Sequence, residues 1–228
     1  MTDVDPSRTR RRRLSLKQEA ANYIRDLIFS GKVRAGERLD QDGIAAALEV
    51  SRLPIREALI TLEAEGMVTN VVRRGAFVAA LEPEDILDHF RMYGLLSGIA
   101  AERVAEQRPP EVVERLTTLM QQMRASSEPA QHDELNYLFH KTINRAGGSR
   151  RLISVLRILA NNMPSNFFAS NTEWEFREQT FAEHEQIVTH IREGEGKAAA
   201  EALAKHFVHT GEQAVRHLEA VGFWAGTE

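Results

Sequence analysis

The sequence of 228 residues contains no cysteine. This absence excludes a disulfide-stapled scaffold, a thiolate zinc site, an iron–sulfur cluster and a cysteine nucleophile. No apolar run approaches the ~18 residues that a membrane-spanning helix needs. The N-terminus is basic, but no apolar segment follows it as one would in a secretory signal peptide. We therefore expect a cytoplasmic protein with no membrane partner.

The amino-acid composition is ordinary for a globular protein, but charge is unevenly distributed along the chain. Hydrophobic residues make up 43% of the chain and charged residues 27%, as in globular proteins of one large or two modest domains. Residues 1–79 contain 14 Lys and Arg against 11 Asp and Glu, whereas the remainder contains 15 against 22. The first part is therefore expected to meet a polyanion. The alternative is a basic disordered tail, because five arginines lie within residues 8–13.

The first 80 residues predict a small DNA-binding fold. Residues 1–15 are expected to form a flexible basic arm, and a helical period begins at Leu16. Asp40 and Ser51 are positioned to cap two further short helices. Strand-like runs on either side of Arg73-Arg74-Gly75 predict a hairpin. Residues 16–80 therefore predict a winged helix-turn-helix with a two-stranded wing.

The rest of the chain, from Glu82-Pro83 onward, has a helical period throughout. Helices are expected over residues 83–107, 110–126, 130–146, 149–163, 174–193 and 196–220. The fold class is therefore mainly α, with an all-α bundle over residues 83–222. An apolar stripe in the first of these helices predicts either bundle core or a dimer interface. It consists of Leu95, Leu96, Ile99, Ala100 and Val104.

Two arginines stand where a recognition helix would enter the major groove. Arg52 lies in the first turn of the helix that Ser51 begins, and Arg56 follows one turn later on the same face. An arginine can bind guanine O6 and N7 with two hydrogen bonds, and a helix N-terminus can hold a phosphate. Further phosphate or minor-groove contacts are expected from Lys32, Arg34, Arg73 and Arg74. The alternative is that these charges form a solvated helix face.

Residues 16–80 resemble the winged helix-turn-helix of the GntR family of bacterial repressors. The resemblance rests on Gly31, Gly36, Leu39, Ile44, Ala45 and Leu48, on VSRLPIREALITLEAEGMV, and on RRGAFV. It implies a homodimer that reads a short palindromic operator in double-stranded DNA. The DNA contacts that it implies are Lys32, Ser51, Arg52, Leu53, Pro54, Arg56, Arg74 and Gly75. One departure is Glu49, because the family usually has glycine in this turn.

Residues 83–220 resemble the helical effector domain of the FadR subgroup, called FCD. The resemblance rests on NYLFHKTINRAGG (136–148), on the segment from His184 to Ala198, and on His206. Asn136 and His140 share one helix face, and three imidazoles with one oxygen ligand suit Zn²⁺ or Ni²⁺. Metal-binding members of the subgroup usually carry aspartate at the position of Asn136. We assign the other histidines to the surface or the core, namely His89, His132, His190, His209 and His217.

The small-molecule effector is expected to be bound differently from a simple carboxylate. The arginine that grips a carboxylate in this subgroup is replaced by Tyr93, and the acidic residue four positions later is Ser97. Another cation, Arg91 or Arg145, could then hold the effector. The polar and aromatic segment from Asn161 to Phe168 could border a ligand cavity, or it could be a core-facing loop.

We interpret the chain as a transcription regulator, with repression relieved by the effector as the commoner outcome in the family. A second hypothesis is a metal-dependent hydrolase on the bundle, with Glu183 or Glu185 as the general acid or base. A third is an architectural DNA-binding protein without an effector.

Overall fold

The computed structural model describes residues 15–162 and 177–224, and the chain divides into two compact units, residues 1–80 and 81–228. Residues 1–14 of the expected arm over residues 1–15, and residues 163–168 of the segment 161–168, lie outside the described residues. Each unit is described by itself. No helix within the described residues combines the length and the apolar character needed to cross a bilayer.

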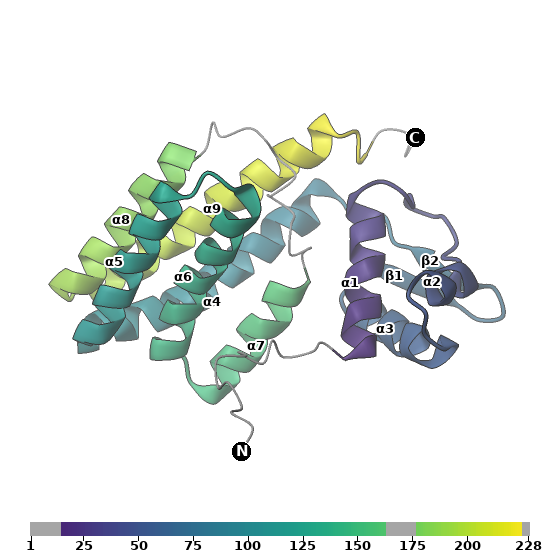
Figure 1. Cartoon of the computed structure of the whole chain (residues 1–228), viewed down its shortest axis with the longest axis horizontal. Helices are drawn as coiled ribbons and strands as arrows, with labels where there is room; N and C mark the ends of the chain where they lie inside the picture. The colour runs from purple at the N-terminus through teal and green to yellow at the C-terminus, as the bar shows by residue number, and fades with distance from the viewer. Residues whose placement is uncertain (1–14, 163–176, 225–228) are drawn as a thin grey trace, which may run out of the picture. The chain divides into compact units, whose positions relative to one another are not determined.

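Three helices and a hairpin make up the described part of the first unit (Figure 1). They are α1 (Leu16–Phe29), α2 (Gln41–Ala47), α3 (Arg52–Ala64), β1 (Val68–Val71) and β2 (Gly75–Val78). The strands are antiparallel, and Val68 is paired with Val78. The turn is Val72-Arg73-Arg74, one residue earlier than the sequence predicts, because Arg73 adopts the left-handed conformation and Gly75 already belongs to β2.

Local signals fix the ends of these helices. Ser15 and Gln18 form a reciprocal capping box at the start of α1, and the Asp40 carboxylate accepts a hydrogen bond from the Gly43 N–H at the start of α2. The apolar faces of α1 and α3 pack against each other and are fully buried at Ile24 and Ile55. This packing leaves the opposite face of α3 free for solvent.

The described part of the second unit is an all-α bundle, which confirms the predicted fold class. Its helices are α4 (Pro83–Gln107), α5 (Pro110–Ala125), α6 (Pro129–Gly147), α7 (Arg150–Asn161), α8 (Arg177–Glu193) and α9 (Gly196–Ala220). Proline occupies the first position of α4, α5 and α6, where no intrahelical N–H bond is lost. The expected starts of α4, α5 and α9 agree with the structure, whereas α6 begins at Pro129, one residue earlier than expected.

The two longest helices, α4 and α9, lie side by side along most of their length (Figure 1). Glycine makes this approach possible, because a Cβ at Gly94 would lie 2.8 Å from the Cβ of Phe207. The predicted apolar stripe of α4 divides between two faces. Ala100 and Val104 are buried in the core, whereas Leu95 is 65% exposed and Ile99 39%.

Candidate functional sites

The exposed face of α3 begins with the two predicted arginines. Ser51 is the N-cap residue, but its hydroxyl makes no capping hydrogen bond, which corrects the expectation that it caps the helix. The side chains of Ser51, Arg52 and Arg56 are exposed. Arg52 forms an ion pair with Asp42 of α2, and its Nη2 donates to the Asp42 Oδ2 at 2.7 Å. Sequence reasoning had missed Asp42.

The turn between α2 and α3 keeps its geometry in spite of its glutamate. Glu49 takes the left-handed backbone conformation with φ 53°. The N–H groups of Glu49 and Val50 bond back to the carbonyls of Ala46 and Ala45 at 3.2 and 3.0 Å. The glycine-like turn therefore forms without glycine, at a conformational cost of ~1 kcal/mol.

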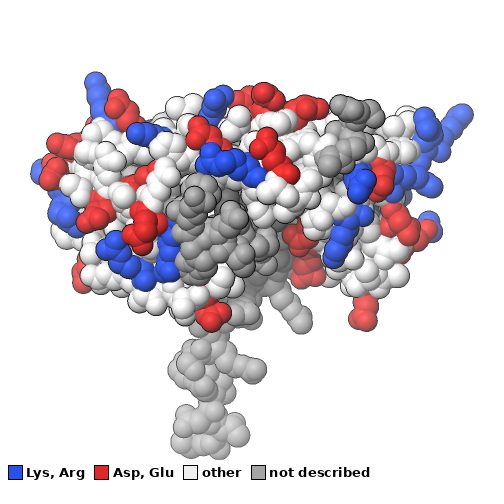
Figure 2. Space-filling model, turned by 90° about the horizontal axis from the view of Figure 1, so that it is seen from above, with Lys and Arg blue, Asp and Glu red and all other residues white. Residues whose placement is uncertain are grey.

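Most of the other predicted DNA contacts are also on the surface of the first unit. Lys32, Arg34, Arg73 and Arg74 are exposed, and Leu53 is 64% exposed. The Arg74 guanidinium lies over the ring of Phe77 at 5.7 Å, which holds it at the wing. Figure 2 shows basic side chains projecting from this unit at the right of the view, with acidic side chains beside and below them, and both signs mixed over the second unit.

Two residues of the predicted set differ in exposure from the others. Pro54 is buried, unlike its neighbours Arg52 and Leu53, and its contact with DNA stays a prediction. Gly75 is half-buried at the start of β2, where a Cβ would lie 3.0 Å from the Arg38 Nε.

Three predicted metal ligands converge in the second unit from three different helices. His140 lies on α6, His184 on α8 and His206 on α9, and their exposures are 5%, 0% and 3%. One nitrogen from each ring lies within 4.8 Å of the others. The Nε2 atoms of His206 and His140 face each other at 3.2 Å. We call these three residues the histidine cluster.

Buried polar atoms without partners surround the histidine cluster. Both ring nitrogens of His184, the Nδ1 of His140 and the Oδ1 of Asn136 have no hydrogen-bond partner within the described residues. Burial, and then the neighbouring His206, lowers the pKa values of His140 and His184 well below 6.5. These two rings are therefore neutral at pH 7 and carry free lone pairs, as metal ligands must.

Glu183 is a further member of this site that sequence reasoning had assigned only to the hydrolase hypothesis. Its carboxylate lies 2.7 Å from the His206 Nδ1 and 2.5 Å from the His209 Nδ1. Burial acts to raise the pKa of Glu183, but hydrogen bonds from His206 and His209 outweigh burial and lower it. A carboxylate on the Nδ1 side directs the His206 Nε2 lone pair toward the cluster. His209 thus belongs to this network, although the sequence analysis had assigned it to the surface or the core.

The donor set fits a divalent cation such as zinc. Imidazoles bound at about 2.0–2.1 Å in a tetrahedron have nitrogens about 3.3 Å apart, close to the His140–His206 separation. Without a cation, the same two nitrogens can share a hydrogen bond, because a neutral His140 can carry its proton on Nε2 and donate it to the His206 Nε2. Asn136, the predicted oxygen ligand, lies one turn before His140, and its Oδ1 is buried without a hydrogen-bond partner among the described residues.

The predicted effector residues are not brought together. Arg91 is exposed and pairs with Asp88 at 3.4 Å, and Arg145 is exposed on α6. Tyr93 instead faces the interior, where its hydroxyl accepts a hydrogen bond from the Asn144 Nδ2 at 3.1 Å and burial raises its pKa to about 12. Its ring packs against Phe207 at 4.7 Å, and Phe207 also contacts His140. Only Tyr93 of the three therefore approaches the histidine cluster.

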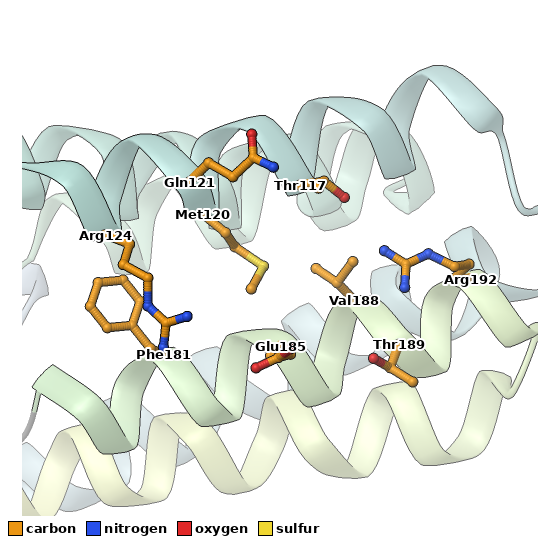
Figure 3. Close-up of a pocket in the computed structure, with 9 residues that line it drawn as sticks. All are labelled: Thr117, Met120, Gln121, Arg124, Phe181, Glu185, Val188, Thr189 and Arg192. Atoms are coloured by element: carbon orange, nitrogen blue, oxygen red, sulfur yellow. The ribbon is translucent and has the colours of Figure 1, made fainter.

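A groove of about 230 Å³ lies between α5 and α8 (Figure 3). Met120 and Val188 form its apolar middle, with Arg124 beside Phe181 at one end and Arg192 at the other. None of the predicted effector residues lines this groove. Glu185, the second acid of the hydrolase hypothesis, lines it and is not among the residues of the histidine cluster.

Comparison with known protein families matches both parts of the chain. Residues 16–78 match the family described as bacterial regulatory proteins, gntR family. Residues 88–209 match the FCD domain.

Similar proteins have been named as regulators in several bacteria. An uncharacterized HTH-type transcriptional regulator of Mycobacterium tuberculosis is 34% identical over 81% of this chain and 75% of its own length. The gluconate operon transcriptional repressor of Bacillus licheniformis is 27% identical over 86% of this chain and 83% of its own length. Among solved structures, E. coli McbR/YncC has a TM-score of 0.68 at 18% identity and covers 90% of this chain and 99% of its own.

Proposed function

The chain belongs to the gntR family of bacterial regulatory proteins and carries an FCD domain, and from this premise we propose that it represses transcription at an operator until an effector occupies the FCD domain. Members of this family regulate transcription by binding DNA and are not enzymes. Relatives named as gluconate operon repressors support repression as the direction of control. A regulator of this kind works where the DNA is, so we propose a cytoplasmic location.

The observation that carries this proposal is the exposed arginine pair of α3. Arg52 and Arg56 stand one turn apart at the N-terminal half of a helix whose opposite face is buried in the unit. In a helix-turn-helix this end of the second helix enters the major groove. Each guanidinium can bind a guanine, with ~1–3 kcal/mol of discrimination against a wrong base. The free hydroxyl of Ser51 is available for a phosphate.

We propose that two copies associate through an apolar face of α4 and α7. Met92, Leu95 and Ile99 follow one face of α4 and are exposed, and Val155 and Ile158 are exposed on the neighbouring α7. Exposed apolar side chains that gather on one face are typical of an interface. A two-fold dimer would present two copies of α3 to the half-sites of a palindrome.

The histidine cluster would hold a divalent metal, zinc or nickel, through His140, His184 and His206, with Asn136 as the oxygen ligand. When bound, such an ion supplies a Lewis-acid anchor for an oxygen atom of the effector. Asn136 is uncharged, so the affinity for the ion is expected to be lower than in sites with aspartate. Tyr93 contributes a hydroxyl that stays protonated at neutral pH, which suits it to hydrogen-bond an effector.

Control by an effector requires that the effector bind two conformational states of the protein with different affinities. The effector can shift the equilibrium only if it binds the DNA-competent state less tightly than the other state. The histidine cluster joins α6, α8 and α9, so a ligand there would change how these helices pack.

DNA binding is tested with duplexes that the wild-type chain selects from a randomised pool. Arg52→Ala should abolish discrimination between the selected and a scrambled duplex, while the melting temperature stays the same. Arg124→Ala removes an exposed arginine of α5 and should leave discrimination intact. Unchanged discrimination in Arg52→Ala would exclude the proposed reading helix.

The metal and effector are tested by elemental analysis and thermal shift. His184→Ala should lose a bound divalent ion that the wild-type chain retains after dialysis. Equal metal content in the two proteins would remove the histidine cluster as the site. A metabolite that raises the melting temperature only with a divalent ion, and that also weakens DNA binding, would identify the effector.

A further inference from the structure

Asp42 and Arg52 join the two helices of the helix-turn-helix through a fork of contacts. The Arg52 Nη2 donates to the Asp42 Oδ2 at 2.7 Å, and the Arg52 Nε contacts the Asp42 Oδ1. Nε and Nη2 form one edge of the planar guanidinium. The carboxylate therefore occupies that edge and fixes the plane of the group.

The fork leaves the outer edge of the Arg52 guanidinium free. A guanidinium has five N–H donors, and Asp42 uses one from Nε and one from Nη2. Both donors of Nη1 and the second donor of Nη2 remain. This pair of nitrogens is the edge that can bind guanine O6 and N7 together. The ion pair thus orients Arg52 for a base and does not consume its reading edge.

The exposure of the Asp42–Arg52 ion pair argues against a role in folding stability alone. The side chains of Arg52 and Asp42 are 69% and 63% exposed, and exposed ion pairs contribute little to folding stability. A carboxylate at a surface that binds phosphate also opposes non-specific attraction. By contrast, the buried pair of Arg25 and Glu65, at 2.6 Å, links α1 to the end of α3 as a core contact.

We propose that Asp42 is a positioning residue that sharpens sequence discrimination by the chain. It holds Arg52 in the base-reading orientation and lowers affinity for unrelated DNA, because it restrains a guanidinium that would otherwise reach for phosphates. This inference rests on the proposed function as a DNA-binding regulator and adds to it a residue that governs specificity.

The test compares Asp42→Asn with the wild-type chain on the selected duplex and on a scrambled duplex of equal length. We expect the ratio of the two affinities to fall about tenfold, within the range that one good base contact provides. Affinity for the scrambled duplex should rise and depend more steeply on salt. The reason is that the Arg52 guanidinium, no longer paired with a carboxylate, can contact a phosphate and displace one more counterion from the DNA. The melting temperature should be unchanged.

Two controls separate this role from a general effect of charge. Glu178→Gln removes one negative charge from an exposed pair with Arg124 at 3.8 Å in the second unit, and it should leave the affinity ratio unchanged. In an Arg52→Ala background, where discrimination is already lost, Asp42→Ala should raise affinity for the scrambled duplex less than it does in the wild-type chain, because Asp42 acts through Arg52.

Three results would overturn the inference about Asp42. These are a fall in affinity for the scrambled duplex in Asp42→Asn, an unchanged ratio in Asp42→Asn, which includes an equal rise in affinity for both duplexes, or an Asp42→Ala effect of the same size with and without Arg52. A wild-type chain that selects no sequence would instead overturn the proposed function itself. The two failures are therefore distinguished by the wild-type measurement alone.

Discussion

At the scale of single residues, the left-handed backbone conformation of Glu49 lowers the free energy of unfolding. A side chain at φ 53° crowds the following carbonyl, whereas glycine adopts this conformation freely. We expect Glu49→Gly to raise the free energy of unfolding by about 0.5–1 kcal/mol, measured by urea denaturation. Glu57→Gly, within α3, should lower it by ~1 kcal/mol. Equal destabilisation by both changes would contradict strain at position 49.

A second residue-scale prediction concerns the carboxylate behind His206. Glu183→Gln removes the charge that accepts hydrogen bonds from His206 and His209. Loss of such a partner typically weakens metal affinity 10–100-fold, and we expect about tenfold in competition with a chelating dye. Glu185→Gln, an equal charge change in the α5–α8 groove, should have no effect. A loss of affinity in both variants would point to general electrostatics.

The sequence could predict single residues only where a pattern or a resemblance marked them. Arg52 and Arg56 follow from helical spacing, and the histidine cluster from the resemblance to the FCD domain. Asp42 and Glu183 act through partners on other helices, 10 and 23 residues away in the chain. Their roles depend on how helices pack, which no local spacing encodes.

At the scale of helices and strands, the sequence predicts where a helix begins better than it predicts which of its faces is buried. Proline at the first position and capping side chains mark the starts of α2, α4 and α5 in the sequence itself. The faces of α4 could not be separated in this way, because apolar residues occur on more than one side. Only the packing of α4 against α9 shows that Ala100 is buried and Leu95 is exposed.

The exposed face of α4 gives a prediction about association. Leu95→Glu should convert the proposed dimer into monomers, because it places a charge in the apolar face formed with α7. Light scattering after gel filtration measures the mass. Val221→Glu changes an exposed apolar residue just after α9, at 57% exposure, and should leave the mass unchanged. A Leu95→Glu chain of unaltered mass would place the interface elsewhere.

At the scale of the whole molecule, buried histidines make stability depend on pH. Burial lowers the pKa of His89 to about 4 and lowers those of His140 and His184 well below 6.5. In the unfolded chain these rings titrate near ~6.5, so below that pH the unfolded state binds more protons. In the metal-free chain the free energy of unfolding should therefore fall as pH drops from 6.5 toward 4.

The size of this effect can be measured by denaturation at several pH values in the presence of a chelator. His89 alone should account for on the order of 2–3 kcal/mol between pH 7 and pH 4. His89→Leu should remove that share of the pH dependence. A His89→Leu chain with the same slope as the wild type would show that the fold does not lower the pKa of His89.

The indole of Trp224 donates a hydrogen bond to the carbonyl of Leu81 at 2.6 Å, so the residues just after α9 are fastened to the residue that opens the second unit. Helix α9 also carries His206, so the same helix contributes to the histidine cluster and leads directly to the Trp224 contact at the start of the bundle. A shift of α9 when a ligand binds the histidine cluster would therefore act on Leu81, the residue that follows the winged-helix unit in the chain. In a chain whose other tryptophan is removed by Trp174→Phe, the emission wavelength of Trp224 should therefore shift with the exposure of its indole to water as α9 moves.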